Sequence, residues 1–252
     1  MRHQKKKQID GIVFGIRAVI EAIQSGKTIN KVLVQRELKG DLFKELWQLL
    51  QDHKITIQKV PFQKLNGITG KNHQGVIAFI SPISYQNIEW IVPSIYEKGI
   101  DPLILILDRV KDVRNFGAIA RTAECLGVHA IVVPDRDAAL VNSDAIKTSA
   151  GALHKIPVCK VPQLKKTISY LSEAGLTIIG CTEKAEKKIS DQPLNGPMAI
   201  IMGSEEDGID NKLLVKCDYL VKIPLSGSIQ SLNVSVACAI MIYEVQRQQN
   251  IV

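Results

Sequence analysis

The chain has 252 residues, 46% of them hydrophobic and 23% charged, a composition typical of a globular protein with one large domain or two small ones. Its longest apolar runs are strand-sized, and its basic start is not followed by the apolar core of a signal peptide. We therefore expect no membrane span and a cytoplasmic location. The net charge of +7 favours nucleic acid as a partner, although the lysines at 5–7 fit a merely solvated tail equally well.

Residues 1–80 are predicted to form a small α/β unit, which at about 80 residues is large enough to fold alone. Apolar residues at helical spacing predict a helix over Phe14–Gln24, ended by Ser25-Gly26. A strand at Lys31–Val34, an amphipathic helix at Asp41–Gln51 and an alternating strand at Ile55–Val60 follow. A short helix then begins at Pro61, and a buried strand at Val76–Ile80 ends the unit.

A polar loop, GKNHQG at 70–75, precedes the last of these strands. Glycines at both ends and four polar side chains between them predict an exposed loop that can approach a ligand closely. A plain turn would explain the same composition. Residues 81–101, with Pro82, Pro93 and a helical stretch near Glu89–Tyr96, are predicted to connect two domains.

Residues 102–252 alternate strongly apolar strands with helices, which predicts a parallel sheet covered on both faces. The strands are expected at Leu103–Leu107, Ala130–Val133, Pro157–Val161, Leu176–Gly180, Met198–Met202 and Tyr219–Ile223. The helices between them are expected at Phe116–Leu126, Ser143–Ala152, Gln163–Ala174 and Asn211–Cys217. Ligands of such sheets bind beyond the carboxyl ends of the strands, and that rule selects the loops after Leu107, Gly180, Met202 and Leu225.

Two of these loops carry charge. The loop DRVKDVRNFG at 108–117 lacks the G-x-G turn of dinucleotide-binding folds, which argues against a Rossmann dehydrogenase. In the helix after it Arg121 has apolar neighbours, where an arginine pairs with a carboxylate or phosphate; a purely structural salt bridge stays open. The loop GSEEDG at 203–208 would repel a phosphate, and Glu205 is predicted to accept a hydrogen bond from a ligand or to fix Arg121.

The stretch Ile223–Glu244 is predicted to complete the site. Ser231, Asn233 and Ser235 are typical of a helix N-terminus, and the helix from Leu232 to Tyr243 is apolar nearly all round, so it requires cover on more than one side. A helix start rich in donors can bind polar groups of a ligand. A well-capped core helix explains the same residues.

Three segments, RNFGAIARTAECLG, IIMGSEEDGI and IPLSGSIQSLNVSVACAIMIYE, closely resemble the motifs of the SpoU-type (TrmH) RNA ribose 2′-O-methyltransferases. That family belongs to the SPOUT class, whose chain end is tucked through a deep trefoil knot. FGIRAVIEA and NHQGV resemble the L30e-type RNA-binding domain of the branch that methylates a guanosine of 23S rRNA. The resemblance covers nearly the whole chain.

The resemblance implies S-adenosylmethionine as cofactor and a homodimer whose first and last helices of the C-terminal domain pack across the interface. It implies no metal, and the scattered cysteines and histidines indicate buried free thiols and no zinc site. Glu183 is less typical of the family and leaves the contact near Thr182 open. The implied catalytic residues are Arg121, Asn115, Glu205, Ser231 and Asn233; the implied cofactor residues are Thr182, Gly203, Ile223, Ser231, Leu232 and Asn233; the implied RNA contacts are Arg17, Lys71, Asn72, His73, Gln74 and Arg114.

An arginine is always protonated and a poor base, so we expect Arg121 to stabilise negative charge on the ribose oxygen. Asn115 and Ser231 would orient the ribose, and Glu205 would hold Arg121 or Asn233. Two other functions stay open: a tRNA ribose 2′-O-methyltransferase, and a catalytically silent RNA-binding or ribosome-assembly protein.

Overall fold

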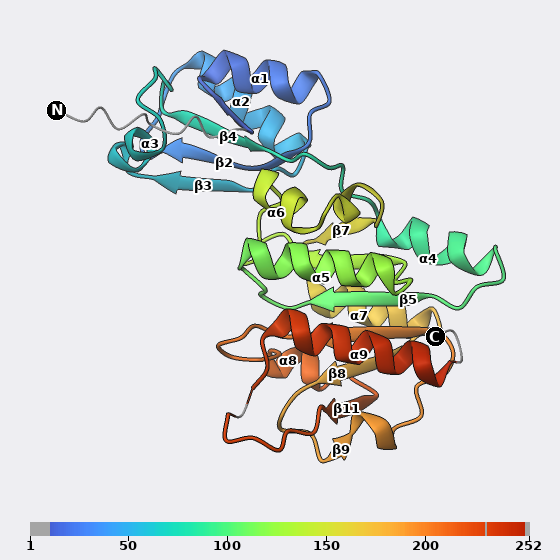
Figure 1. The fold of residues 1–252 in the computed structure, drawn as a ribbon. Coiled ribbons are helices and arrows are strands. Elements are labelled where there is room, and N and C mark those ends of the chain that lie inside the picture. The colour runs from blue at the N-terminus through green and yellow to red at the C-terminus, as the bar shows by residue number, and fades with distance from the viewer. Residues whose placement is uncertain (1–10, 230, 250–252) are drawn as a thin grey trace. The chain divides into compact units, whose positions relative to one another are not determined.

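The computed structural model describes residues 11–229 and 231–249, so the lysines at 5–7 lie outside the described residues. Contacts divide the chain into two compact units (Figure 1). One extends to Ser84 and includes Val141–Ser143; the other comprises Tyr85–Leu140 and the chain from Asp144 onward.

The first unit is a four-stranded sheet in the order β1-β4-β2-β3, with helices on both faces. Strand β2 is parallel to β3 and antiparallel to β4. Side chains alternate along a strand, so Val76 and Ala78 of β4 pack under α1 and α2, while Ile77 packs with Leu65 of α3 on the other face. The elements are β1 Ile12–Phe14, α1 Ile16–Gln24, β2 Ile29–Gln35, α2 Asp41–Asp52, β3 Ile57–Val60, α3 Phe62–Ile68 and β4 Val76–Ile80.

Strand β1 was not predicted, and the helix expected from Phe14 begins only at Ile16. Gly15 separates the two with a φ of 92°, a left-handed conformation that glycine adopts without strain. The backbone reverses at this glycine, so Phe14 ends a strand instead of opening a helix.

The second unit is a seven-stranded parallel sheet in the order β7-β6-β5-β10-β8-β11-β9. Ile104 and Ile106 of β5 belong to the core under α4, α7 and α8, and helices α5 and α9, which pack against each other, cover the opposite face. The helices are α4 Ile88–Tyr96, α5 Val113–Cys125, α6 Ser143–Thr148, α7 Leu164–Glu173, α8 Asn211–Leu214 and α9 Val234–Gln248. The strands are β5 Leu103–Leu107, β6 Ala130–Pro134, β7 Val158–Val161, β8 Thr177–Cys181, β9 Lys187–Lys188, β10 Met198–Met202 and β11 Tyr219–Lys222.

The predicted parallel sheet covered on both faces is confirmed, while four helix predictions need correction. The helix expected at Phe116–Leu126 begins at Val113, because Asp112 caps it, and ends at Cys125. The helix expected over Ser143–Ala152 stops at Thr148, because Ala150 and Gly151 have positive φ, and a 3-10 turn at Ala152–His154 follows. The helix expected to reach Cys217 ends at Leu214. The last helix begins at Val234, two residues after the predicted start.

The prediction that α9 is covered on more than one side is wrong for the single chain. Val236, Ile240 and Tyr243 are 48%, 36% and 51% exposed. These three residues form an apolar stripe on the outer side of α9, because positions three and four apart share a helix face. Every helix within residues 11–229 and 231–249 is too short or too polar to cross a bilayer.

Candidate active site

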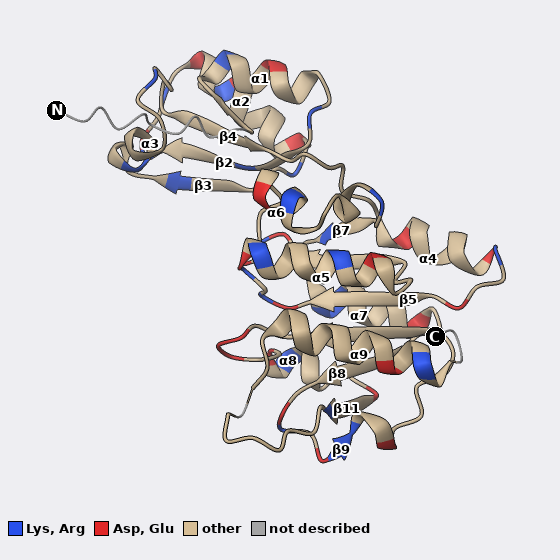
Figure 2. Ribbon diagram, in the orientation of Figure 1, with Lys and Arg blue, Asp and Glu red and all other residues tan. Residues whose placement is uncertain are grey.

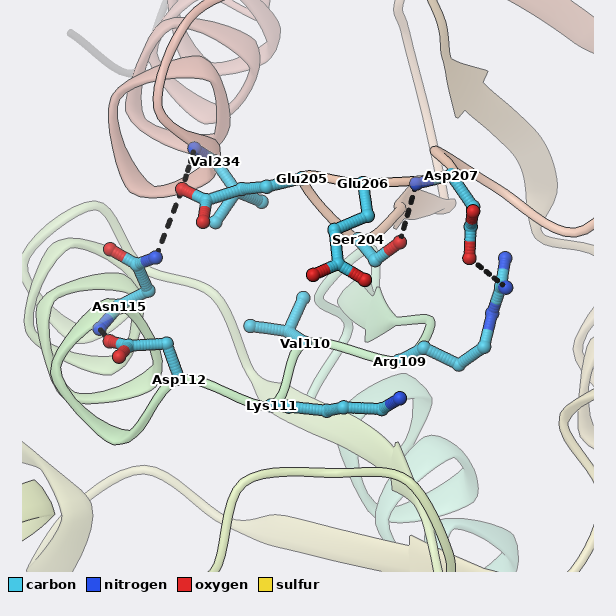
Figure 3. Close-up of a pocket in the computed structure, with 10 residues that line it drawn as sticks. All are labelled: Arg109, Val110, Lys111, Asp112, Asn115, Ser204, Glu205, Glu206, Asp207 and Val234. Atoms are coloured by element: carbon cyan, nitrogen blue, oxygen red, sulfur yellow. Dashed lines mark hydrogen bonds and ion pairs between the residues drawn. The ribbon is translucent and has the colours of Figure 1, made fainter.

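Glu205 is the centre of a hydrogen-bond network that joins segments far apart in the sequence (Figure 3). Its Oε1 atom accepts hydrogen bonds from Nδ2 of Asn115 at 3.0 Å, from Nδ2 of Asn233 at 2.8 Å and from the backbone N–H of Val234 at 3.4 Å. Asn233 also donates to Oδ1 of Asn115 at 3.0 Å. Three of the predicted catalytic residues therefore form one cluster.

Helix starts position both asparagines. Asp112 caps α5, since its Oδ1 accepts from the backbone N–H of Asn115 at 2.7 Å. Asn233 caps α9, since its Oδ1 accepts from the backbone N–H of Ser235 at 2.9 Å. A capping asparagine uses its carbonyl oxygen for the helix and leaves its amide nitrogen free to donate, and Asn233 directs that nitrogen at Glu205.

The loop that carries Glu205 is a tight turn after β10. Ser204 and Gly208 exchange two backbone hydrogen bonds of 3.1 and 3.0 Å, and Ser204 Oγ accepts from the N–H of Asp207 at 3.1 Å. Gly203 is required by the packing here, because a Cβ atom at this position would lie 2.1 Å from the carbonyl carbon of Gly208. The turn therefore presents Glu205 in a fixed position.

Arg109, which was not predicted from the sequence, connects this loop to the end of β5. Its guanidinium donates to the carboxylate of Asp108, to Oδ2 of Asp207 at 3.1 Å and to the carbonyl oxygen of Gly208 at 3.1 Å. Asp108 is 4% exposed and also accepts from the N–H of Asp210 at 2.8 Å. The hydrogen bonds to Asp108 raise the pKa of Arg109 above its usual value, so Arg109 is a permanent cation. The signal in the sequence that could have located this contact is Asp108, a carboxylate directly after the buried strand β5.

A cavity of about 550 Å³ lies at the carboxyl ends of β8, β10 and β11. This volume is within the range of small-molecule sites. Five of the six predicted cofactor residues line it, and Asn233 lies outside the lining. The five are Thr182, Gly203, Ile223, Ser231 and Leu232.

The cavity is acidic, and Figure 2 shows the acidic loop after β10 in red. Its lining holds one cation, Lys184, and four carboxylates: Glu183, Glu205, Glu206 and Asp207. Such a lining repels phosphate and suits a ligand with positive charge. Thr182 is 6% exposed, and its N–H donates to the carbonyl oxygen of Val221 at 2.9 Å, so backbone pairing fixes this wall.

A second, smaller cavity of about 360 Å³ lies on the other side of the Glu205 loop. Arg109, Lys111, Asp112 and Asn115 line it, and it shares Ser204, Glu205, Glu206, Asp207 and Val234 with the first cavity (Figure 3). The same short loop therefore borders two cavities.

Arg121 lies apart from this cluster. It is exposed on α5, almost two turns beyond Asn115, and makes no hydrogen bond or ion pair with any described residue. Of the two predicted partners of Glu205, the structure shows Asn233 and not Arg121, which pairs with no carboxylate among the described residues of one chain. Arg114 is exposed on the same helix.

The polar loop of the first unit is only partly exposed. His73 is 3% exposed, so the prediction that all four polar side chains face solvent is wrong for this residue. Its Nδ1 accepts from the N–H of Gly75 at 3.0 Å, which places the ring proton on Nε2, 2.9 Å from Oδ1 of Asn66. His73 therefore shapes the loop.

The other predicted RNA contacts of this unit are exposed: Arg17, Lys71, Asn72 and Gln74. Oε1 of Gln74 accepts from the N–H of Ile16 at 3.2 Å, and Nζ of Lys71 lies 5.5 Å from the centroid of the Phe14 ring. Both contacts hold the loop beside the start of α1, where Arg17 lies. The described residues contain no group of His, Cys, Asp and Glu arranged to hold a metal ion.

Comparison with known proteins assigns both parts of the chain. Residues 102–243 match the SpoU rRNA Methylase family, and residues 12–86 match the family described as RNA 2'-O ribose methyltransferase substrate binding. A provisionally named TrmH family tRNA/rRNA methyltransferase from Staphylococcus saprophyticus is 37% identical over 241 residues, covering 95% of this chain and 96% of the relative. YacO of Bacillus subtilis, provisionally named in the same way, is 36% identical over 239 residues, covering 94% and 96%.

Among solved structures, the SpoU methyltransferase AviRb from Streptomyces viridochromogenes in complex with AdoMet superposes with a TM-score of 0.59 at 25% identity. The match covers 94% of this chain and 89% of that one. The fold, the cluster around Glu205 and these matches lead to one conclusion: the chain belongs to the SpoU (TrmH) family of RNA methyltransferases.

Proposed function

We propose that this protein methylates the 2′-hydroxyl of a ribose in RNA with S-adenosylmethionine, and that the target is a guanosine of 23S rRNA. The observation that carries the methyl transfer is the Glu205 loop, which borders two cavities and whose Glu205 bonds to Asn115 and Asn233. Carboxylates of this loop line both cavities; the larger one adds a single cation, Lys184, and the smaller one adds Arg109 and Lys111. A cationic donor would occupy the larger cavity, with the ribose of the acceptor on the other side of the loop.

The acidic cavity fits the cofactor. When bound, S-adenosylmethionine supplies a methyl group made electrophilic by its positive sulfonium, and it carries no phosphate for the carboxylates to repel. Backbone near Thr182, Gly203, Ile223 and Leu232 would hold it, with Ser231 at the rim. AviRb, a SpoU methyltransferase of similar fold, is crystallised with AdoMet.

The chain's own residues position the ribose and stabilise charge. Asn115 and Ser231 would orient the sugar, and Glu205 would hold Asn233 and Asn115 in place through the hydrogen bonds to its Oε1. Arg121 would stabilise the negative charge that develops on the ribose oxygen, because a guanidinium nearby lowers the pKa of an alcohol. These groups act by orientation and electrostatics.

Arg121 requires an explanation, because it is solvent-exposed and unpaired within the described chain. We propose a homodimer through α5 and α9. The apolar stripe Val236, Ile240 and Tyr243 on α9 supports this assembly, since a second copy would cover it.

We also propose the deep trefoil knot, because the last segment lines one cavity together with the loops after β8 and β10.

The first unit supplies the basic surface for RNA. Residues 11–84 hold ten Lys or Arg and five Asp or Glu, a net charge of +5, whereas residues 85–252 hold 18 and 19, a net charge of −1. The polyanion-binding character of the chain is therefore concentrated at its front. We propose that residues 1–80 form an L30e-like RNA-binding domain that uses Arg17, Lys71, Asn72 and Gln74, and that 81–101 link it to the methyltransferase domain.

The decisive experiment is a map of 2′-O-methyl groups on 23S rRNA and tRNA from cells with and without the protein. Loss of one methylated guanosine in 23S rRNA supports the proposal. Loss of a tRNA methyl group would move the target to tRNA. Unchanged maps, together with no calorimetric binding of S-adenosylmethionine, would leave a silent RNA-binding protein.

A further inference from the structure

A groove of about 710 Å³ lies on the first unit, and no residue of the polar loop at 70–75 lines it. It is formed by α2, by the chain just before it and by β3, which is an edge strand of the sheet. None of the residues assigned above to RNA or catalysis lines it. The lining residues are Leu38, Lys39, Gly40, Phe43, Lys44, Trp47, Gln48 and Lys59.

The groove combines aromatic side chains with cations. The rings of Phe43 and Trp47 lie 5.8 Å apart at 59°, and Nζ of Lys59 lies 5.2 Å from the centroid of the Trp47 ring. Phe43 also packs against the core of the unit, but both rings are only partly buried, so each keeps a portion open to the groove.

Charge identifies the partner. Three lysines line the groove and no carboxylate does. Lys44 pairs with Asp41 at 2.7 Å, but both side chains are highly exposed, so this pair leaves most of the positive field in place. Proteins that bind single-stranded nucleic acid combine aromatic rings, on which bases stack, with cations that follow the phosphates.

We propose that this groove binds a single-stranded segment of the RNA substrate, with a base stacked on the Trp47–Phe43 wall and phosphates facing Lys39 and Lys59. The proposal rests on the RNA-modifying function proposed above. The groove is a second contact, separate from the loop at 70–75, and it extends the bound RNA over α2 and β3.

Tryptophan fluorescence tests the proposal directly, because the chain has only Trp47 and Trp90. Trp90 is 77% exposed on α4, so Trp90→Phe leaves Trp47 as the single reporter without altering the groove. Titration with a single-stranded oligoribonucleotide is expected to quench Trp47 saturably. Inorganic polyphosphate, which has the charge but no bases, is expected to compete without quenching. Equal quenching by both, or RNA binding with no quenching, would overturn the stacking role.

Variants of the full-length protein complete the test. Trp47→Ala is expected to weaken oligonucleotide binding about 5- to 100-fold, with recovery in Trp47→Phe. Lys59→Ala is expected to weaken binding and to reduce its salt dependence, whereas Lys27→Ala, a control at an exposed lysine outside the groove, is expected to change binding much less. Preferential binding of an acidic peptide over the oligonucleotide would show that the groove docks a protein and would overturn the proposal.

Failure of the groove and failure of the proposed function give different results. If the wild-type protein methylates RNA and Trp47→Ala has an unchanged KM for RNA, the groove proposal is wrong and the function stands. If the oligonucleotide quenches Trp47 but no RNA is methylated, the groove stands and the function does not. The expected result is a raised KM for RNA in Trp47→Ala, with unchanged binding of S-adenosylmethionine.

Discussion

Asn233 has two separable roles, and two substitutions distinguish them. Its carbonyl oxygen caps α9, and its amide nitrogen donates to Glu205 and Asn115. Asn233→Ala removes both. Asn233→Asp keeps an oxygen for the cap but replaces the donor with a second carboxylate directed at Glu205.

The two variants are expected to rank differently in stability and in activity. Loss of the cap costs about 1 kcal/mol, and loss of a donor to an exposed carboxylate adds a few tenths to about 1 kcal/mol, so Asn233→Ala is expected to lower the free energy of unfolding by about 1–2 kcal/mol. In Asn233→Asp the repulsion from Glu205 costs about 1 kcal/mol in water, and a negative charge at the helix N-terminus offsets about 0.3–1 kcal/mol. Its stability should therefore lie within about 1 kcal/mol of the wild type.

Turnover should nevertheless fall in both variants, by about 10²-fold, because each loses the donor that holds Glu205 and Asn115 in register. Denaturant unfolding and methyl transfer to RNA measure the two effects. In Asn233→Asp each carboxylate raises the pKa of the other, so acidification protonates one of them and restores an O–H donor. The activity of this variant relative to wild type should then rise from pH 8 to pH 5. Turnover of Asn233→Asp within twofold of the wild type would show that the donor at position 233 is not needed to position Glu205 and Asn115.

Four further predictions concern Arg109, His73 and, in two cases, the thiols. Arg109→Ala frees the Glu205 loop and should raise the KM for S-adenosylmethionine several-fold, with partial recovery in Arg109→Lys; an unchanged KM would show that the loop needs no tie. His73→Ala leaves Asn66 and the N–H of Gly75 unpaired and should lower the free energy of unfolding by about 1–3 kcal/mol, whereas a neutral result in denaturant unfolding would contradict a structural role. The prediction of buried thiols is wrong for Cys125, which is exposed, so Cys125 should react first with iodoacetamide at pH 8; rapid native-state alkylation of the buried thiols would contradict their burial. Burial raises the pKa of Cys159, Cys181 and Cys217 to about 12. The stability that these thiols contribute is therefore fully present below about pH 9, the pKa of an unfolded thiol, and falls as the pH rises towards 12. Denaturant unfolding at pH 8 and pH 10.5 measures this loss.

The parallel sheet could be predicted because its strands are continuous apolar runs. Leu103–Leu107 and Met198–Met202 were placed without error, since five buried residues in a row admit few alternatives. Strand Ile12–Phe14 was missed because its three residues continue the apolar spacing of the helix after Gly15. Boundaries set by a positive φ, as at Ala150 and Gly151, leave no such trace in hydrophobic periodicity.

The candidate site could be predicted in its parts, and of its connections only the hydrogen bond between Glu205 and Asn233 was among the predicted alternatives. Resemblance supplied Asn115, Glu205 and Asn233, and the structure shows that Glu205 is bonded to the asparagines and not to Arg121. Arg109 was missed because its partners, Asp207 and Gly208, are close only once β5 and β10 lie side by side. Pairings across the sheet of this kind depend on three-dimensional register, which a single sequence does not contain.

The order of synthesis gives the Glu205 network a consequence for the newborn protein. Of the residues that bond to Glu205, Asn233 and Val234 are synthesised more than a hundred residues after Asn115. Until they are present, Oε1 of Glu205 has one hydrogen-bond donor instead of three. A chain that ends before α9 lacks part of the wall of both cavities and also one of the two helices that cover this face of the sheet. We therefore expect a chain that ends before α9 to lack methyltransferase activity.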